Sequence, residues 1–283
     1  MKSFLFLIFC AMAFAEPCLS RTLLIDPLLF PVLITHEKGA GSGCFLQLSN
    51  SVYLVTARHV LFSEPEGTNP PVLLSSTAVI KSFSSAGTTN VTERNFILDL
   101  TQLMSFGEVR YSTNGDIALV RIEDCDPTNR NLVTLLPGVM LGNPFVGLQP
   151  MSSSMVCVLT NVDVGADVYM FGYPMSLTAP IRNKFDLAQP LLRKGIVAGV
   201  SLSKRTIVVD SPSYQGNSGG PVIQVEHPEF GATDYKIIGV VSAFVPFEEE
   251  WENKTLRYSH VTVSNSGYTL VEPIDSALEL VWK

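Results

Sequence analysis

The chain has 283 residues, of which 46% are hydrophobic and 16% charged, with a net charge of −7 and a pI of about 5.1. This composition supplies a sizeable core for one or two domains. The charge is spread along the sequence without a basic stripe, which argues against a nucleic-acid or anionic-membrane partner.

Residues 1–15 are predicted to be a signal peptide. Lys2 supplies a positive charge, residues 4–14 are almost wholly apolar, and Ala13-Phe14-Ala15 fits an A-x-A cleavage site. A retained membrane anchor is the alternative, but the apolar stretch is shorter than the roughly 20 residues that span a bilayer. We therefore expect a secreted or periplasmic protein that begins at Glu16 and has no later membrane-spanning helix.

Four cysteines remain after removal of the signal peptide: Cys18, Cys44, Cys125 and Cys157. Export permits disulfides, and four cysteines allow three pairings that the sequence does not choose between. No spacing of Cys and His is typical of a zinc site, so we expect neither a metal nor a cofactor.

Short apolar stretches bounded by turn residues predict strands through the rest of the chain. Residues 45–48 and 51–56 flank Ser49-Asn50, which suits a tight hairpin turn, and residues 116–122 form a further strand. Residues 63–75 and 82–90 are polar and predict loops. Residues 137–154, rich in Gly, Pro and Ser, predict a connection between two halves.

The second half begins with the apolar stretch 155–159 and continues through four more predicted strands, at 167–174, 195–200, 205–210 and 235–245. Residues 273–282 are the best helix candidate, with Pro273 at its first position. Many short strands with a helix only at the end predict an all-β fold. Two halves of similar size suggest two barrels with a cleft between them, at about 24–136 and about 155–283.

Residues 216–221, Gly-Asn-Ser-Gly-Gly-Pro, follow the predicted strand 205–210 and suit a nucleophile loop. A serine hydroxyl needs a base to take its proton, and that base needs a third group to orient it. The glycines permit a tight turn that exposes Ser218 and points backbone N–H groups at a developing oxyanion. The alternative is a glycine-rich turn with an incidental serine.

A base and an orienting acid stand at the ends of two other apolar stretches. His59 is one of four histidines and follows Thr56-Ala57-Arg58 at the end of a predicted strand. Asp116 follows Gly115 and precedes an apolar run. A lone histidine or aspartate in such a place is more often structural, but together with Ser218 they give the order His, Asp, Ser.

These three stretches resemble the motifs of trypsin-like, chymotrypsin-fold serine proteases. Thr56-Ala57-Arg58-His59 is similar to the T-A-x-H motif, residues 115–119 to the D-I-A-L segment, and residues 216–221 to the nucleophile loop. The resemblance covers roughly residues 35–283 and implies two packed six-stranded β-barrels. It is strongest to the bacterial HtrA/Deg-like branch, which Asp210, Asn217, Gly41-Ser42-Gly43 and residues 168–174 also match.

The resemblance implies a role for each matching residue. Ser218 is the nucleophile, His59 the general base and then general acid, and Asp116 the group that orients His59. The N–H groups of Gly216 and Ser218 form the oxyanion hole. The first barrel would supply His59 and Asp116 and the second Ser218, so activity should depend on how the barrels dock.

Several positions depart from the family pattern. About 65 residues follow Ser218, which leads us to expect no C-terminal PDZ domain. Asn217 replaces the aspartate that pairs with a freshly cut N-terminus in digestive members, so we expect no such activation. Because Val60 follows His59, Cys44 lacks the cysteine partner that brackets the histidine in vertebrate members.

The predicted substrate pocket has an uncharged floor at Pro212, where a preference for Lys or Arg needs an acid. Its wall is Ser242-Ala243-Phe244, and Phe244 stands where the family often has glycine. Val241 stands where glutamate-specific members place a histidine. We therefore expect a small or medium apolar side chain before the cleaved bond.

The leading interpretation is an exported serine endopeptidase that acts on proteins or peptides through an acyl-enzyme. A protease-like binding module blocked by Phe244 is the main alternative. An esterase could use the same triad, but residues around Ser218 lack the strand–turn–helix pattern of α/β-hydrolases.

Overall fold

The computed structural model describes residues 29–63, 70–83, 93–125, 133–142, 148, 150–175, 184, 189–226, 233–255 and 257–282. The signal peptide, Cys18 and the proposed start at Glu16 lie outside these residues. In the described ranges, none of the helices is both long and apolar enough to cross a lipid bilayer.

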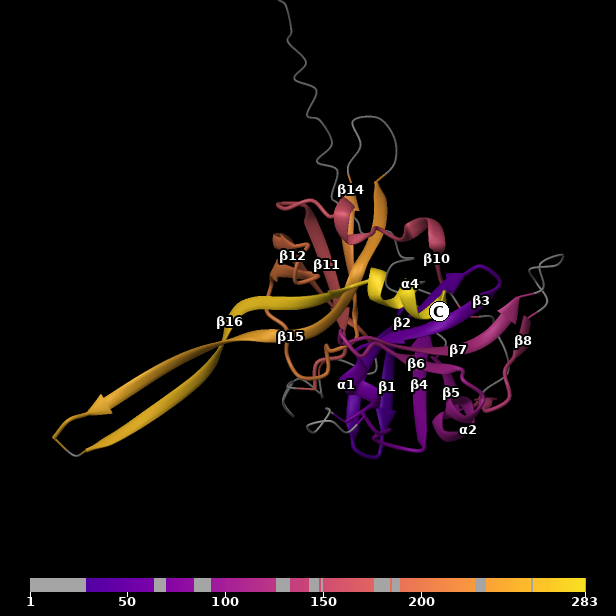
Figure 1. The fold of residues 1–283 in the computed structure, drawn as a ribbon, viewed down its shortest axis with the longest axis horizontal. Helices are drawn as coiled ribbons and strands as arrows, with labels where there is room; N and C mark the ends of the chain where they lie inside the picture. The colour runs from indigo at the N-terminus through magenta and orange to yellow at the C-terminus, as the bar shows by residue number, and fades with distance from the viewer. Residues whose placement is uncertain are drawn as a thin grey trace, which may run out of the picture.

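The N-terminal half is a curled sheet in the order β6-β7-β3-β2-β1-β4-β5-β9, with β10 added to β2 and β8 to β7 (Figure 1). Ten strands of the described residues make it up: β1 (Pro31–His36), β2 (Gly39–Leu48), β3 (Ser51–Thr56), β4 (Thr77–Phe83), β5 (Glu93–Asp99), β6 (Val109–Tyr111), β7 (Ala118–Cys125), β8 (Val133–Leu135), β9 (Val139–Leu141) and β10 (Met151–Ser152).

The C-terminal half is a closed six-stranded barrel in the order β11-β12-β13-β16-β15-β14 within the described residues. Its strands are β11 (Asp167–Gly172), β12 (Leu191–Ser201), β13 (Thr206–Asp210), β14 (Pro221–Glu226), β15 (Asp234–Asn253) and β16 (Tyr258–Pro273). The helices of the described chain are α1 (Arg58–Leu61), α2 (Leu100–Ser105) and α4 (Asp275–Val281), with 3₁₀ turns η2 (Ser153–Met155) and η3 (Leu159–Asn161).

The fold is thus the all-β double-barrel class expected from the resemblance. The C-terminal barrel has the six strands expected, whereas six long strands of the N-terminal sheet are joined by the short strands β6, β8, β9 and β10.

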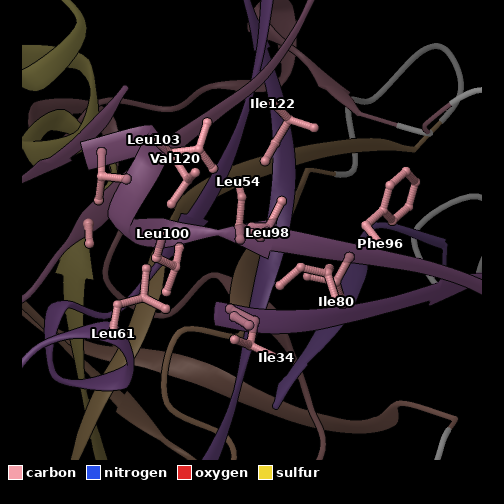
Figure 2. Close-up of a cluster of buried hydrophobic side chains, with 14 of the residues drawn as sticks. Ile34, Leu54, Leu61, Ile80, Phe96, Leu98, Leu100, Leu103, Val120 and Ile122 are labelled. Carbon is pink, nitrogen blue, oxygen red and sulfur yellow. The ribbon is translucent and has the colours of Figure 1, made fainter. Parts of the chain in front are cut away.

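The core of the N-terminal half comes from the alternation of side chains along its strands. Figure 2 shows Ile34, Leu54, Ile80, Leu98 and Val120 converging from β1, β3, β4, β5 and β7. All five are at most 1% exposed, and burying a side chain of this size contributes about 1.5–3 kcal/mol. A separate cluster, which includes Val168, Ile207, Val222 and Val271, fills the C-terminal barrel.

The two halves pack through the opposite faces of β2 and β3. Phe45 and Leu54 point into the first core, whereas Leu46 and Val55 point into a cluster that contains Ile237 of the second barrel. Side chains of α4 complete this cluster. The strands are apolar on both faces because each face is buried, which explains the unbroken apolar run at 52–55.

Two expectations about the elements were wrong. Helices occur before the end of the chain, and α2 is capped by Asp99, whose side chain accepts a hydrogen bond from the Gln102 N–H at 2.8 Å. Pro273 is the last residue of β16, and α4 starts at Asp275. Within residues 137–154, the predicted connection, β9 pairs with β5 and β10 with β2 in the first sheet.

Among the described residues, Cys44 and Cys157 are free cysteines. Cys44 is fully buried between the two halves, and burial raises the pKa of its thiol far above the ordinary value. Burial likewise raises the pKa of Cys157 to about 11. Both thiols therefore remain protonated at neutral pH and are poor nucleophiles.

Candidate active site

The loop 216–221, between β13 and β14 of the second barrel, contacts the first barrel in a conformation that requires glycine. Gly216 has φ of 95° and Gly219 has φ of 83°. A Cβ at Gly216 would meet the backbone of Tyr173, and one at Gly219 would meet the carbonyl oxygen of Ser42. Both glycines are needed because L side chains rarely adopt such φ values and because no space exists for a Cβ.

Ser42 of β2 fastens this loop to the first barrel. Its backbone N–H donates to the carbonyl of Ser218 at 2.8 Å, and its hydroxyl donates to the carbonyl of Gly216 at 2.6 Å. The hydroxyl in turn accepts from the Tyr173 N–H at 3.0 Å. Ser42 is fully buried, so these bonds are shielded from water and fix the loop by its carbonyl groups.

The loop has five backbone N–H groups, and three of them donate hydrogen bonds to carbonyl groups of the protein. Those of Asn217, Gly219 and Gly220 donate to the carbonyls of Tyr214, Val241 and Asn217 at 2.7–2.9 Å. Those of Gly216 and Ser218 donate to no group in the part of the chain that the structure describes. The two donors expected to form an oxyanion hole are therefore the two left over.

His59 lies in α1, one turn of helix immediately after β3. Thr56 at the end of β3 pairs with Ala118 at the start of β7, so the residues that follow β3 and precede β7 emerge at one end of the sheet. The Arg58 guanidinium donates to the carbonyls of Ser112 and Gly115 at 3.0 and 3.2 Å. This ties α1 to the loop that carries Asp116.

His59 and Asp116 are joined by two contacts. His59 Nδ1 lies 2.8 Å from Asp116 Oδ2, and the backbone N–H of His59 donates to Asp116 Oδ1 at 3.1 Å. The Ser242 hydroxyl donates to the same Oδ2 at 2.6 Å. The imidazole is held by its Nδ1, which leaves Nε2 as the nitrogen available for proton transfer.

The charge on Asp116 is favoured by these contacts. Burial acts to raise the pKa of its carboxyl, but hydrogen bonds and charge from His59, together with the bonds from Ser242 and the His59 N–H, outweigh it and lower the pKa. Asp116 is therefore a carboxylate at neutral pH, able to stabilise a neighbouring imidazolium.

His59, Asp116 and Ser218 line one cavity of about 620 Å³ between the two barrels. The Ser218 hydroxyl is 3.5 Å from the carbonyl oxygen of Ser242, at the outer limit of a hydrogen bond, so it is not strongly committed there. A larger cavity of about 780 Å³ shares Arg58 and Asp116 with it but contains neither His59 nor Ser218. The smaller cavity is the candidate active site.

The predicted pocket residues divide into those that line this cavity and one that does not. Ser242, Ala243 and Phe244 line it, whereas Pro212 is not among its lining residues. Phe244 is 44% exposed, so its ring stands at the wall without being buried across the opening.

Sequence reasoning missed Tyr214, whose ring also lines the cavity and has the Arg193 guanidinium 4.9 Å from its centroid. It treated Ser42 as a family marker and Ser242 as a wall residue, although both bond to triad-bearing segments. It did not identify Glu272, whose carboxylate lies against the backbone of Gly115 and Asp116. No local signal in the sequence links these residues, because each partner lies on another strand.

Comparison with known proteins identifies the family. Residues 41–229 match the family model described as "Trypsin-like peptidase domain", which covers more than half of the chain. The chain therefore belongs to the trypsin-like peptidases, and the resemblance seen in its motifs is confirmed. A comparison with curated proteins gives no match.

The chain is also similar to two solved structures. One is described as "HtrA-type protease AlgW with tripeptide", with 15% identity and a TM-score of 0.46 over 90% of this chain. A serine-to-alanine variant of AlgW with tripeptide gives 14% identity and a TM-score of 0.46 over 91% of this chain. The chain spans 60% of the length of each.

Proposed function

We propose that this trypsin-like peptidase is an exported serine endopeptidase that uses Ser218, His59 and Asp116 as its triad. The observation that carries the proposal is their presence around one cavity, with His59 Nδ1 2.8 Å from Asp116 Oδ2. The three residues come from three separate segments and two barrels, and no requirement of packing alone explains their convergence.

In the first step, the Ser218 oxygen attacks the carbonyl carbon of the scissile peptide bond while His59 takes the hydroxyl proton. The resulting imidazolium is stabilised by the Asp116 carboxylate, which remains ionised. His59 then returns the proton to the leaving amine, the carbon–nitrogen bond breaks, and an acyl-enzyme forms. Water, deprotonated by His59, hydrolyses the ester and restores Ser218.

The oxyanion of each tetrahedral intermediate would be held by the N–H groups of Gly216 and Ser218. Support comes from their lack of an acceptor among the described residues, while the other donors of the loop are used. Donors that are fixed before reaction are worth about 2.7–4 kcal/mol of transition-state stabilisation each. The bonds from Ser42 to the carbonyls of Gly216 and Ser218 favour this arrangement.

The cavity suits a small or medium apolar side chain before the cleaved bond. Tyr214, Ala243 and Phe244 supply apolar walls. Asp116 is the carboxylate among the lining residues, and it is engaged by His59 and Ser242. A basic substrate side chain would therefore find no free counter-charge. Profiling on a peptide library tests this preference, and dominance of basic or acidic residues would contradict it.

We also propose that the protein needs no cut to a new N-terminus. Asn217 is 2% exposed and uncharged, so the position next to Ser218 offers no carboxylate to a buried ammonium group. Secreted protein that begins at Glu16 should be active as it is. Inactivity until trimming at one specific bond would refute this, and sequencing the secreted protein's N-terminus also tests the signal peptide.

Labelling with a fluorophosphonate probe tests the proposed function directly. The probe should label the wild-type protein at Ser218, and Ser218→Ala should abolish labelling without changing the unfolding midpoint. Ser213→Ala, at another serine lining the cavity, is the matched control and should still be labelled. Absence of wild-type labelling would favour the alternative of a protease-like binding module.

A further inference from the structure

A two-stranded arm projects from the second barrel. The arm is residues 246–265, in which β15 and β16 pair from Pro246↔Asn265 to Asn253↔Tyr258. Figure 1 shows it extending far beyond the rest of the molecule. All residues at 246–252 and 258–264 are exposed. The arm therefore contributes little to the core of either barrel.

A projecting arm of this kind is not expected to be stable on its own in an isolated protein. A lone two-stranded hairpin is marginally stable in water, and its outer edges present unpaired backbone groups. The arm also leaves Trp251, Val263 and Tyr258 exposed by 64%, 57% and 56%. Exposed apolar side chains concentrated in one element are typical of an interaction surface.

The two faces of the arm differ in character. Side chains alternate along β15, so Phe247 and Trp251 lie on one face and Glu248, Glu250 and Glu252 lie on the other. We call these the aromatic face and the acidic face. Within the described residues, none of the three glutamates of the acidic face forms an ion pair.

Valines complete the acidic face from the neighbouring strand. Val263 is paired with Glu248, and Val261 with Glu250, and directly paired residues share a face. A row of like charges beside exposed valines is unfavourable alone but complementary to a partner that carries both basic and apolar groups. Since the chain itself has a net charge of −7, a second copy is a poor partner for this face.

The outer edge of the arm continues the wall of the candidate active site. β15 pairs with β14 as far as Val240. The next residue, Val241, accepts a backbone hydrogen bond from the Gly219 N–H and donates one to the Gly220 carbonyl. From Ser242 onward this edge of β15 has no strand partner among the described residues. Ser242 and Phe244 line the cavity with Ser218, so one open strand edge runs from the cavity along the arm.

We propose that the arm is an exosite for an extended segment of the polypeptide substrate, in which Lys or Arg alternates with apolar residues. This segment adds to the outer edge of β15 as a third strand. Its basic side chains lie beside Glu248, Glu250 and Glu252, and its alternate apolar side chains lie on the aromatic face beside Phe247 and Trp251. The inference rests on the proposed endopeptidase function, because it names part of the substrate.

Binding is tested with the full-length protein carrying Ser218→Ala, so that no peptide is cut. The probes are fluorescent peptides of about twelve residues: alternating Lys and Val, the same residues in two blocks, and alternating Glu and Val. Fluorescence anisotropy at low salt should show the alternating Lys-Val peptide binding about three- to tenfold more tightly than the block peptide. The Glu-Val peptide should bind most weakly, and added salt should reduce the difference.

Variants of neighbouring glutamates supply the matched comparison. Glu248→Gln/Glu250→Gln/Glu252→Gln should abolish the preference for the alternating peptide. Glu250→Gln alone should weaken binding about two- to threefold, whereas Glu249→Gln, one residue away on the aromatic face, should not. Equal effects of the two single variants, or equal binding of the alternating and block peptides, would overturn the proposal.

Cleavage separates this proposal from the proposed function. A short peptide that the wild-type protein cuts is compared with the same peptide extended by the alternating Lys-Val segment on either side. The extension should raise kcat/KM about three- to tenfold on one side, and not in the triple variant. If the short peptide is cut but neither extension helps, the exosite is wrong and the endopeptidase stands. If the protein neither cuts the peptide nor reacts with the fluorophosphonate probe, the proposed function is wrong, and so is the assignment of a substrate segment to the arm.

Discussion

The carboxylate of Glu272 lies against the backbone of Gly115 and Asp116. Glu272 lies in β16 of the second barrel, and the Ser276 hydroxyl in α4 donates to its Oε1 at 2.7 Å. Gly115 leaves room for this contact, because a Cβ there would meet the same carboxylate. The second barrel thus holds the backbone of the residue that orients His59, and we infer that Glu272 is a positioning residue.

Two replacements of Glu272 should show whether the residue acts by positioning Asp116 or by its negative charge. Glu272→Ala removes the carboxylate that lies against the backbone of Asp116, so kcat on a short peptide should fall about tenfold while KM changes little. Glu272→Gln retains an acceptor oxygen and should keep most of kcat. Ser276→Ala, which removes the hydroxyl donor to Glu272, should have the smaller effect. A loss in Glu272→Gln as large as that in Glu272→Ala would show that charge matters more than position.

Ser242 is expected to contribute through Asp116, since its hydroxyl and His59 Nδ1 contact the same carboxylate oxygen. Ser242→Ala should raise the pKa of Asp116 towards its ordinary value and lower kcat about three- to tenfold. Steady-state kinetics on the short peptide measures this. Ser213→Ala removes a hydroxyl that lines the same cavity but, among the described residues, forms no hydrogen bond with His59, Asp116 or Ser218, so kcat should stay nearly unchanged. Equal losses in both variants would argue against a specific role of Ser242.

The pH dependence of activity should report His59. Imidazole ordinarily protonates near about pH 6.5, and only neutral His59 can accept the Ser218 proton. Because the pKa of Asp116 is lowered, that carboxylate stays ionised well below this range and does not set the acid limb. A plot of kcat/KM against pH should fall with slope one below about pH 6.5. A rate that is flat down to about pH 4 would exclude His59 as the base.

The sequence predicted the residues that meet in the candidate site better than it predicted the scaffold around them. His59, Asp116 and Ser218 could be found because each stands in a local motif at the end of an apolar run, where strand ends bring loops together. Ser42, Ser242 and Glu272 act through partners on distant strands, and a single sequence carries no signal for pairing between strands.

The arm shows a second limit of sequence reasoning. The charge of Glu248, Glu249 and Glu250 alone indicates only that these residues face solvent. The register of β15 against β16 places alternate glutamates on one face and aromatic residues on the other. The same limit explains the helix error at Pro273: its pairing with Gly239 keeps it in β16, and tertiary pairing prevails over the local preference of proline for a helix start.

Ser42 should be required for both stability and reactivity. Ser42→Ala leaves the Gly216 carbonyl and the Tyr173 N–H without their buried partner, which should lower the free energy of unfolding by about 1–3 kcal/mol. A loosened loop should also slow fluorophosphonate labelling of Ser218. Ser75→Ala, at another buried serine of the first half, should leave labelling at the wild-type rate. An unchanged labelling rate in Ser42→Ala would show that Ser42 is not needed to align the loop.

Glu123 should make the fold less stable as pH rises. It is 3% exposed in β7, its Oε2 has no hydrogen-bond partner among the described residues, and burial raises its pKa to about 7. The unfolded chain ionises near its ordinary value, so folding favours the protonated form. The contribution of Glu123 to stability should therefore be most favourable below about pH 4.5, decline through about pH 7, and stay unfavourable above it.

Glu123→Gln tests this dependence because an amide does not ionise. At pH 8 the variant should be more stable than wild type by about 1–3 kcal/mol, with the difference shrinking to near zero at pH 4. Urea unfolding midpoints across this range measure the effect. Glu37→Gln, which removes a carboxylate at an exposed turn, should reproduce the wild-type pH dependence. A stability difference that is the same at every pH would show that ionisation of Glu123 is not its cause.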